Sequence, residues 1–244
     1  EHGGAGIRRE IETALPALLR QCPAAAIAVG FGGPVDRRAG RVAVSHQIEG
    51  WADYPLREWL SRLAQLPVLV ENDANLASLG EAIGGAGTGF DPVFYTNMGS
   101  GVGGGLVVNG RIYHGAKPGE TEIGHVRLDR QGNTVESRCS GWAVDARIRK
   151  LKPSGATGRL VELASTVTRG EARFLASALQ AGDPAAFQVL AETAGDLAFA
   201  LSHVVHLFHP QVIVLGGGLS LVGEPLRAAV AGALPALVME GFHP

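Results

Sequence analysis

A glycine-rich stretch stands out among the residues whose types and spacing could do chemistry. Residues 96–113 read TNMGSGVGGGLVVNGRIY, and 99–104 satisfy the G-x-G-x-x-G pattern of dinucleotide-binding turns. Such a turn must end a strand and open a helix, so that a pyrophosphate rests on the helix N-terminus. Here two apolar runs flank Asn109-Gly110, which is a strong hairpin signal. We therefore expect the glycines to join strand to strand, which disfavours a dinucleotide site.

The same glycines are compatible with a different anion. Five glycines and one serine occupy six of the seven positions 99–105, and each glycine loses extra backbone entropy on folding. A string of this kind suits a loop whose amide N–H groups must approach a phosphate closely. The alternative is a glycine-rich turn that binds nothing. A P-loop is excluded, because G-x-x-x-x-G-K-[ST] does not occur.

Two further groups of polar residues could act on a ligand. Asn72 and Asp73 lie between a predicted strand and a predicted helix, where they could cap the helix or supply a catalytic carboxylate. Their spacing leaves both interpretations open. Glu122 and His125 would face opposite sides of a strand, whereas on a helical turn or curled loop they could converge on one ligand. The alternative for this pair is an ordinary surface contact.

The elements that must position these residues alternate along the chain. We expect strands at 25–30, 41–45, 67–71, 92–98 and 212–216, and helices at 55–66, 75–83, 184–207 and 222–238, after an earlier helical pattern between Ile7 and Leu19. Interleaved strands and helices predict an α/β fold.

Composition narrows the class further. The chain has 244 residues, 46% of them hydrophobic, and a net charge of −2. This balance points away from nucleic acid and from an anionic membrane as partners. Cys22 and Cys139 provide no disulfide framework, so we expect a cytoplasmic protein. No apolar run approaches the roughly 20 residues of a membrane span.

Six segments, in order, resemble the ROK family, whose name covers repressors, open reading frames and kinases and which includes bacterial glucokinases. The resemblance is spread over nearly the whole chain, and the segments are GFGGPVD (30–36), IEGWADYPL (48–56), VENDANLASLGE (70–81), GSGVGGG (99–105), GETEIGH (119–125) and HPQVIVLGGGLS (209–220). One glycine string would be a weak signal, but six segments in the family's order are a strong one.

The resemblance implies an α/β, actin-like ATPase (ribonuclease H-like) fold of two lobes. Residues 1–92 would form the smaller lobe and 93–244 the larger, with the fold incomplete at the N-terminus and at the C-terminus. The implied activity is ATP-dependent phosphorylation of a hexose, glucose first, with ATP and Mg²⁺ as cofactors. Members of the family commonly pair, so a homodimer is expected.

The resemblance also implies roles for individual residues. Asp73 would be the general base that deprotonates a sugar hydroxyl. The other implied contacts fall into three groups: the sugar ligands Gly33, Asn72, Glu122, His125 and Glu136; the phosphate loop of Gly99, Ser100, Gly101, Gly103 and Gly104; and the adenosine-side glycines Gly216, Gly217 and Gly218.

The chain departs from the family pattern at its zinc motif. Most members carry C-x-C-G-x-x-G-C after the histidine, whereas Cys139 is the single cysteine between His125 and Ser140. One histidine and one cysteine cannot complete a tetrahedral zinc site. We therefore expect no metal site. We expect Val126, Leu128 and Val135 to anchor this segment by packing in place of zinc.

A second departure concerns the family's first phosphate motif, D-x-G-G-T. Residues 1–6 read EHGGAG and are interpreted as a loop into the first helix. We expect the motif to precede residue 1, because the chain lacks an initial Met and opens in a helical pattern. The alternatives are a sugar-responsive repressor with an N-terminal winged helix and a sugar-binding protein without turnover.

Three other features are given lesser roles. Lys117 is a weak candidate for neutralising phosphate. The basic stretch 147–152, RIRKLK, is interpreted as a solvated helix face. His203 and His206 lie on an apolar helical pattern and are expected to be structural.

Overall fold

The computed structural model describes residues 3–45, 48–117, 119, 121–151, 155 and 157–242. Its strands are β1 (Ile27–Phe31), β2 (Val35–Asp36), β3 (Arg41–Val42), β4 (Val68–Asn72), β5 (Val93–Met98), β6 (Val102–Val108), β7 (Arg111–Ile112) and β8 (Val212–Gly216). Its α-helices are α1 (Gly3–Gln21), α2 (Leu56–Ala64), α3 (Asp73–Gly84), α4 (Val135–Cys139), α5 (Gly141–Leu151), α6 (Arg159–Ala164), α7 (Leu175–Gln180), α8 (Pro184–Phe208) and α9 (Glu224–Ala233). Short 3₁₀ helices include η1 (Ile123–His125), η2 (Glu171–Phe174), η3 (Gly218–Val222) and η4 (Pro235–Leu237).

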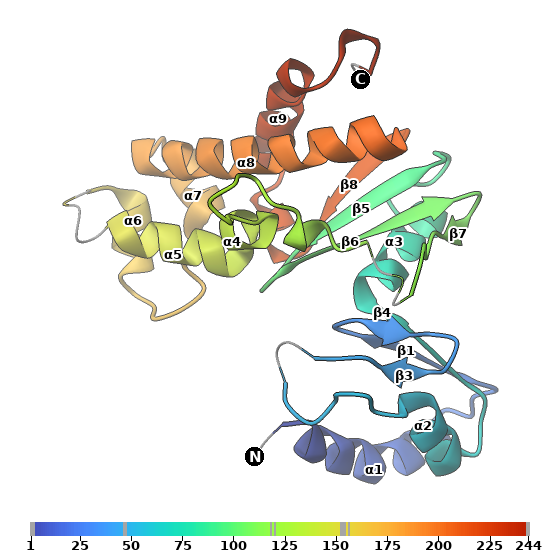
Figure 1. The fold of residues 1–244 in the computed structure, drawn as a ribbon. Coiled ribbons are helices and arrows are strands. Elements are labelled where there is room, and N and C mark those ends of the chain that lie inside the picture. Colours follow the sequence, from blue (N-terminus) through green and yellow to red (C-terminus); the bar gives the residue numbers. More distant parts are fainter. Residues whose placement is uncertain are drawn as a thin grey trace.

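Strands β1 and β4 anchor the N-terminal part of the molecule. They pair in parallel from Ile27 opposite Val68 to Phe31 opposite Asn72, and α1 and α2 pack on one of their faces (Figure 1). The apolar side chains that face these helices alternate along each strand, as a half-covered sheet requires. Both strands therefore end at the same edge, where glycine and polar residues follow them.

A four-stranded sheet in the order β7-β6-β5-β8 forms the centre of the remaining part. Strand β5 pairs antiparallel with β6 and parallel with β8. Asn109 and Gly110 both have positive φ, 52° and 68°, as a two-residue type I′ hairpin turn requires. The predicted strand–glycine–strand–hairpin order is therefore confirmed.

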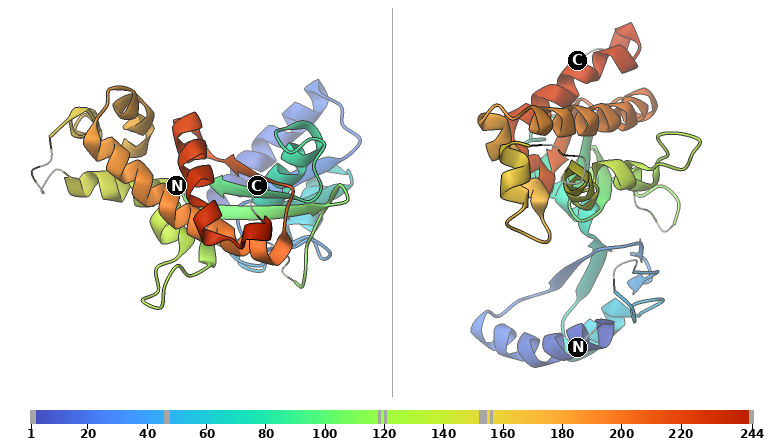
Figure 2. Two further views of the ribbon diagram at one scale, coloured as in Figure 1. Left: turned by 90° about the horizontal axis from the view of Figure 1, so that it is seen from above. Right: turned by 90° about the vertical axis from the view of Figure 1, so that its left-hand side faces the viewer.

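Helices cover both faces of this sheet. Helix α3 packs on one face through Ala77, Leu79 and Ala82, while the long helix α8 and its neighbours α4, α5 and α9 bury the other face around Phe94 and Met98. Figure 2 shows α8 and α9 (orange to red) on the side away from the N-terminal part. Because α3 packs on the four-stranded sheet, its contacts favour a boundary between the two parts of the molecule near β4. The predicted boundary at residue 92 remains a prediction.

Three glycines of the conspicuous string belong to β6 rather than to a loop. A Cβ on Gly103 would lie 3.2 Å from the Cβ of Ala74, and one on Gly105 would lie 2.6 Å from the Cβ of Ser78. A Cβ on Gly104 would lie 3.0 Å from Ile123. These glycines therefore let α3 and η1 approach the strand closely, a packing role that adds to any contact with phosphate.

The helix predictions need correction at both ends of the chain. Helix α1 begins at Gly3, so the glycines interpreted as a loop lie in its first turn, where Gly4 packs against the Gly50 carbonyl. The single helix expected over 222–238 is η3, α9 and η4, because Gly223 has φ 78° and Pro235 opens a new 3₁₀ turn.

The surroundings of the basic stretch 147–152 also differ in part from those predicted. Arg147 contributes Nε to an ion pair with Glu192 at 3.2 Å and Nη2 to one with Asp196 at 3.4 Å. Arg149 pairs with the buried Glu171 at 3.2 Å. The interpretation as a solvated helix face is therefore wrong for Arg147, whose side chain is only 14% exposed, whereas Arg149 and Lys150 are exposed as expected. Lys152 lies outside the described residues.

The two histidines of α8 make structural contacts. The His203 ring stands edge-on to Phe199 with 4.9 Å between centroids. The Nε2 atom of His206 accepts a hydrogen bond from the Met239 amide at 3.2 Å. These contacts agree with the structural role expected for both.

Candidate functional site

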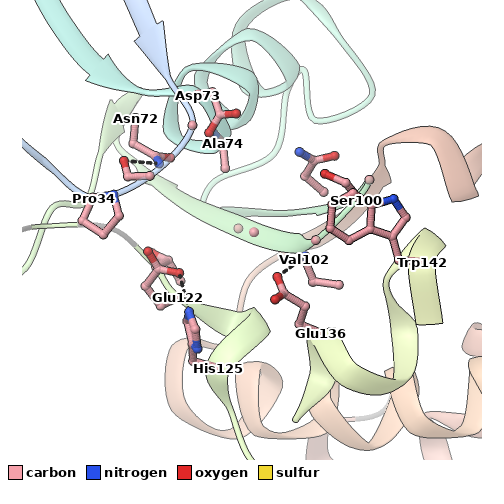
Figure 3. Close-up of a pocket in the computed structure, with 18 residues that line it drawn as sticks. Pro34, Asn72, Asp73, Ala74, Ser100, Val102, Glu122, His125, Glu136 and Trp142 are labelled. Atoms are coloured by element: carbon pink, nitrogen blue, oxygen red, sulfur yellow. Dashed lines mark hydrogen bonds and ion pairs between the residues drawn. The ribbon is translucent and has the colours of Figure 1, made fainter. Parts of the chain in front are cut away.

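A pocket of about 290 Å³ lies at the carboxyl ends of β1, β4 and β5. In open α/β sheets, ligands characteristically bind beyond these ends. The residues that line it are Gly32, Gly33, Pro34, Asn72, Asp73, Ala74, Asn97, Gly99, Ser100, Gly101, Val102, Gly103, Gly104, Thr121, Glu122, His125, Glu136 and Trp142. Figure 3 shows Glu122 and His125 at one side of this pocket and Trp142 beside Ser100 at the other.

The structure assigns the capping role to Asn72, and the catalytic role of Asp73 remains a prediction. Asn72 is the N-cap of α3, because its Oδ1 accepts from the Asn75 amide at 3.0 Å. Its Nδ2 donates to the Gly33 carbonyl at 3.2 Å, which ties the ends of β4 and β1 together. Asp73 is thereby released from capping and lines the pocket.

The carboxyl group of Asp73 has an environment suited to taking up a proton. The residue is accessible through the pocket, yet the protein packed around the carboxyl removes enough water to raise its pKa. A hydrogen bond from the Ala74 amide to Oδ1, 2.8 Å long, acts in the opposite direction without cancelling this effect. A raised carboxyl pKa is the direction expected of a general base.

Glu122 and His125 converge, as a helical turn predicts. Glu122 is the N-cap of the 3₁₀ turn η1 and His125 is its last residue, and 3.9 Å separates His125 Nε2 from Glu122 Oε2. Both side chains are substantially exposed and line the pocket. The turn is pressed onto β6 at Gly124, where a Cβ would come within 2.0 Å of the Val102 carbonyl oxygen. This pair is therefore held beside the glycines by backbone packing.

The carboxylate of Glu136 contacts the glycine turn directly. Its Oε2 accepts a hydrogen bond from the Val102 amide at 3.0 Å, and a Cβ on Gly101 would lie 2.3 Å from the same oxygen. Helix α4, which carries Glu136, begins in a capping box between Thr134 and Ser137. The role of Glu136 as a sugar ligand remains a prediction.

The glycine turn between β5 and β6 is tight. The Gly99 amide donates to the Gly101 carbonyl at 2.9 Å, and the Gly99 carbonyl accepts from the Gly141 amide at 2.8 Å. The second bond connects the turn to the first residue of α5. A helix N-terminus beside a glycine turn favours anions, in keeping with the predicted phosphate loop.

The three glycines predicted on the adenosine side do not line this pocket, but they lie beside Asn97, which does. Gly216 is the register partner of Asn97, and a Cβ on Gly217 would lie 2.3 Å from Asn97 Oδ1. Gly218 begins η3. These positions place the ends of β8 and β5 side by side, while nucleotide contact remains a prediction.

Two residues change the account drawn from the sequence. Trp142, 62% exposed, lines the pocket from the first turn of α5. Sequence reasoning missed it as a pocket residue, although its position just after the Glu136 segment was a usable signal. Lys117 instead forms an ion pair with Asp36 at 2.8 Å. Lys117 does not line the pocket, and its role in neutralising phosphate remains a prediction.

The segment that carries zinc ligands in most family members is held here by hydrogen bonds and packing. Leu128 and Asn133 are joined by a 2.8 Å backbone hydrogen bond, and the carboxylate of Asp129 accepts from the Gln131 and Asn133 amides. Val135 is fully buried and Leu128 packs against the same core, whereas Val126 is 36% exposed. Packing is therefore confirmed for two of the three predicted anchors.

Metal ligands do not gather in this segment. Across the described ranges, no group of three or more His, Cys, Asp or Glu residues could hold a metal ion. Cys139 is buried, and burial raises the pKa of its thiol to about 12. Such a thiol is inert, because the thiolate is the reactive form.

We therefore expect thiol reagents to distinguish the two cysteines of this chain. Cys22 is exposed, so the folded 244-residue chain should react at one thiol and the denatured chain at two. A Cys22→Ser variant should show no reactive thiol until it is unfolded. Titration with a chromogenic disulfide at pH 8 measures both, and two fast-reacting thiols in the native state would contradict the burial of Cys139.

Comparison with known proteins gives the family. The ROK family model matches residues 5–243. A glucokinase of Halalkalibacterium halodurans is 34% identical over 239 residues, which are 93% of this chain and 72% of that protein. A putative xylose repressor of Caldicellulosiruptor sp. is 27% identical over 206 residues, 81% of this chain and 51% of that protein.

A solved structure shows the same architecture. The ROK family glucokinase from Streptomyces griseus, in complex with glucose and AMPPNP, has a TM-score of 0.86 and 28% identity, covering 100% of this chain and 82% of its own. The fold is therefore that of the actin-like ATPases. The chain belongs to the ROK family.

Membrane insertion finds no support in the helices. Among the residues that the structure describes, no helix combines the length and the apolar character needed to cross a bilayer.

Proposed function

We propose that the protein is an ATP-dependent hexose kinase, with glucose as the first substrate to test. One observation carries the proposal. A carboxyl group with a raised pKa, Asp73, lines the same pocket as the Gly99–Gly104 turn and the Glu122–His125 pair. The glucokinase relatives support the same activity.

Phosphoryl transfer in this pocket would use Asp73 as general base. Asp73 takes the proton from one sugar hydroxyl as that oxygen attacks the γ-phosphorus of ATP, and the bond from the phosphorus to ADP breaks. The remaining hydroxyls need partners once they are buried. Those partners would be Gly33, Asn72, Glu122, His125 and Glu136.

The phosphates would lie on the glycine turn. Gly99, Ser100, Gly101, Gly103 and Gly104 would border the phosphates, and Gly216, Gly217 and Gly218 would border the adenosine. Catalysis of this kind depends on positioning and on charge neutralisation. Mg²⁺ would supply part of that neutralisation. It prefers oxygen ligands, retains several waters and is often held by one or two carboxylates together with substrate phosphates, and Glu136 is a carboxylate that lines this pocket beside the glycine turn.

The runner-up is a sugar-responsive repressor, favoured by the xylose-repressor relative of Caldicellulosiruptor. A repressor would bind sugar in this pocket without consuming ATP, as would a sugar-binding protein without turnover. The predicted homodimer and cytoplasmic location fit all three alternatives. Reading the first residues that the gene encodes discriminates between them: D-x-G-G-T directly after the initial Met favours the kinase, and a helix-turn-helix favours the repressor.

A coupled assay of ADP release tests the proposal. The full-length protein should release ADP with glucose, or with one of mannose, fructose, allose and the N-acetylated hexosamines. Calorimetric titration of each sugar measures binding separately. If a sugar binds but the protein releases no ADP with any of these sugars, the kinase assignment is overturned and the runner-up is favoured.

A further inference from the structure

Glu71 and His114 form a half-buried pair beside the catalytic candidates. The Nε2 atom of His114 lies 2.7 Å from Glu71 Oε2, and the side chains are only 22% and 13% exposed. Glu71 is the penultimate residue of β4, directly before Asn72. Hydrogen bonds between an imidazole and a carboxylate are charge-assisted, and partial burial strengthens them.

The other oxygen of Glu71 is bonded to the start of α3. Oε1 accepts from the Asn72 amide at 3.0 Å and from Asn75 Nδ2 at 3.1 Å. Asn75 in turn donates its amide to the cap oxygen of Asn72. One carboxylate therefore connects His114 to both residues that fix the first turn of α3, and Asp73 is in that turn.

His114 reaches this carboxylate from a different part of the fold. It follows β7, at the edge of the four-stranded sheet, and the same segment continues to Thr121, Glu122 and η1. A second contact, between Lys117 and Asp36, joins this segment to β2 but is more exposed. His114 and Lys117 therefore connect the chain after β7 to the N-terminal strands.

We propose that His114 and Glu71 are positioning residues that fix Asp73 relative to the Glu122–His125 side of the pocket. The inference rests on the proposed kinase function. Without His114, Glu71 is free to rotate and to release Asn72 and Asn75, so the carboxyl group of Asp73 loses its fixed orientation. Sugar hydroxyls still bind to Glu122 and His125, and the rate of transfer falls.

The experiment compares His114→Ala, Glu71→Ala and the double variant of the full-length protein. Displacement of a reacting group by about 1 Å can cost about 100-fold in rate. We expect kcat to fall at least about tenfold in each single variant, with the sugar KM changed by less than about threefold. The double variant should be no worse than either single variant, because both substitutions break the same connection. His114→Gln, which keeps a side-chain N–H donor, should restore part of kcat.

Lys117→Met is the matched control, since it removes the exposed ion pair on the same segment. Its kcat should stay within about twofold of the unsubstituted protein, as expected for an exposed pair. Melting temperatures, measured on all variants, show whether each is folded at the assay temperature, so that kcat is calculated per folded molecule.

Two results separate this inference from the proposed function. If the unsubstituted protein phosphorylates sugar and His114→Ala does so at the same kcat, the inference is overturned and the kinase assignment stands. If losses in the single variants add in the double variant, or if Lys117→Met loses as much kcat, the pair does not act as a unit and the inference is overturned. If the unsubstituted protein phosphorylates no sugar, both fail.

Discussion

Asp73→Asn is expected to lower kcat for sugar phosphorylation by about 10²–10⁴-fold, the usual contribution of a general base. The substitution keeps the size of the side chain, and its amide oxygen can still accept the 2.8 Å hydrogen bond from the Ala74 amide. The fold and the neighbouring sugar contacts therefore remain. We expect the dissociation constant for the sugar, measured by calorimetry, to change by less than about threefold.

The pH dependence of kcat adds a second signature to the same prediction. A base must be deprotonated to act, and burial raises the pKa of Asp73 above its ordinary value of 3.8. The rate should therefore fall, as pH is lowered, at a higher pH than for an ordinary aspartate, and should be full above the raised pKa. The residual activity of Asp73→Asn should lack this acid limb.

Asp53→Asn is the matched control for this variant. Asp53 is exposed, and its hydrogen bond with Arg41 lowers the pKa of its carboxyl. Asparagine tolerates its positive φ of 50°. Its kcat and acid limb should equal those of the unsubstituted protein. Turnover by Asp73→Asn within a few-fold of normal would remove Asp73 from its proposed role.

Gly124→Ala is expected to have the second largest effect, acting on sugar binding and stability together. The added Cβ would lie 2.0 Å from the Val102 carbonyl oxygen, and both the oxygen and its carbon belong to the backbone of β6. No rotation of a side chain relieves this contact, so η1 must move away from the strand. Glu122 is the N-cap of that turn and His125 is its last residue, so both would move with it.

We expect this displacement to raise the sugar KM by at least about tenfold and to destabilise the fold by about 1–3 kcal/mol, as overpacking does. Denaturant unfolding and steady-state kinetics measure the two effects. Gly80→Ala is the control, because a Cβ on this residue of α3 meets nothing within 4 Å. It should stabilise the protein by about 0.5–1 kcal/mol. Normal KM in Gly124→Ala would show that η1 does not hold the sugar contacts.

The sequence contained enough information for the framework of the site. The apolar runs and the Asn109-Gly110 turn located β5, β6 and β7, because these signals are local. The predicted strand 67–71 and helix 75–83 lie within one or two residues of the bounds of β4 and α3, because an apolar run that stops at capping residues is also a local signal. The convergence of Glu122 and His125 was predicted on condition of a helical turn, and η1 meets that condition.

Other features depended on contacts between distant residues. Gly103 and Gly105 serve the approach of α3 to β6, which a local pattern of glycines cannot distinguish from a phosphate loop. Arg147 reads as a solvent-facing cation until α8 places Glu192 and Asp196 against it. Helices α6 and α7 are six residues each, too short to show a clear period. The Glu71–His114 pair joins residues 43 positions apart, so spacing gave no sign of it.

The most direct test of the account is a crystal structure of the full-length protein with a bound hexose and a non-hydrolysable ATP analogue. The account predicts one sugar hydroxyl oxygen at roughly 2.6–3.2 Å from a carboxylate oxygen of Asp73. It also predicts the γ-phosphate on the opposite side of that hydroxyl, within hydrogen-bond distance of amides of the Gly99–Gly104 turn. A sugar bound in this pocket with no hydroxyl facing Asp73, or a triphosphate bound away from the glycine turn, would contradict it.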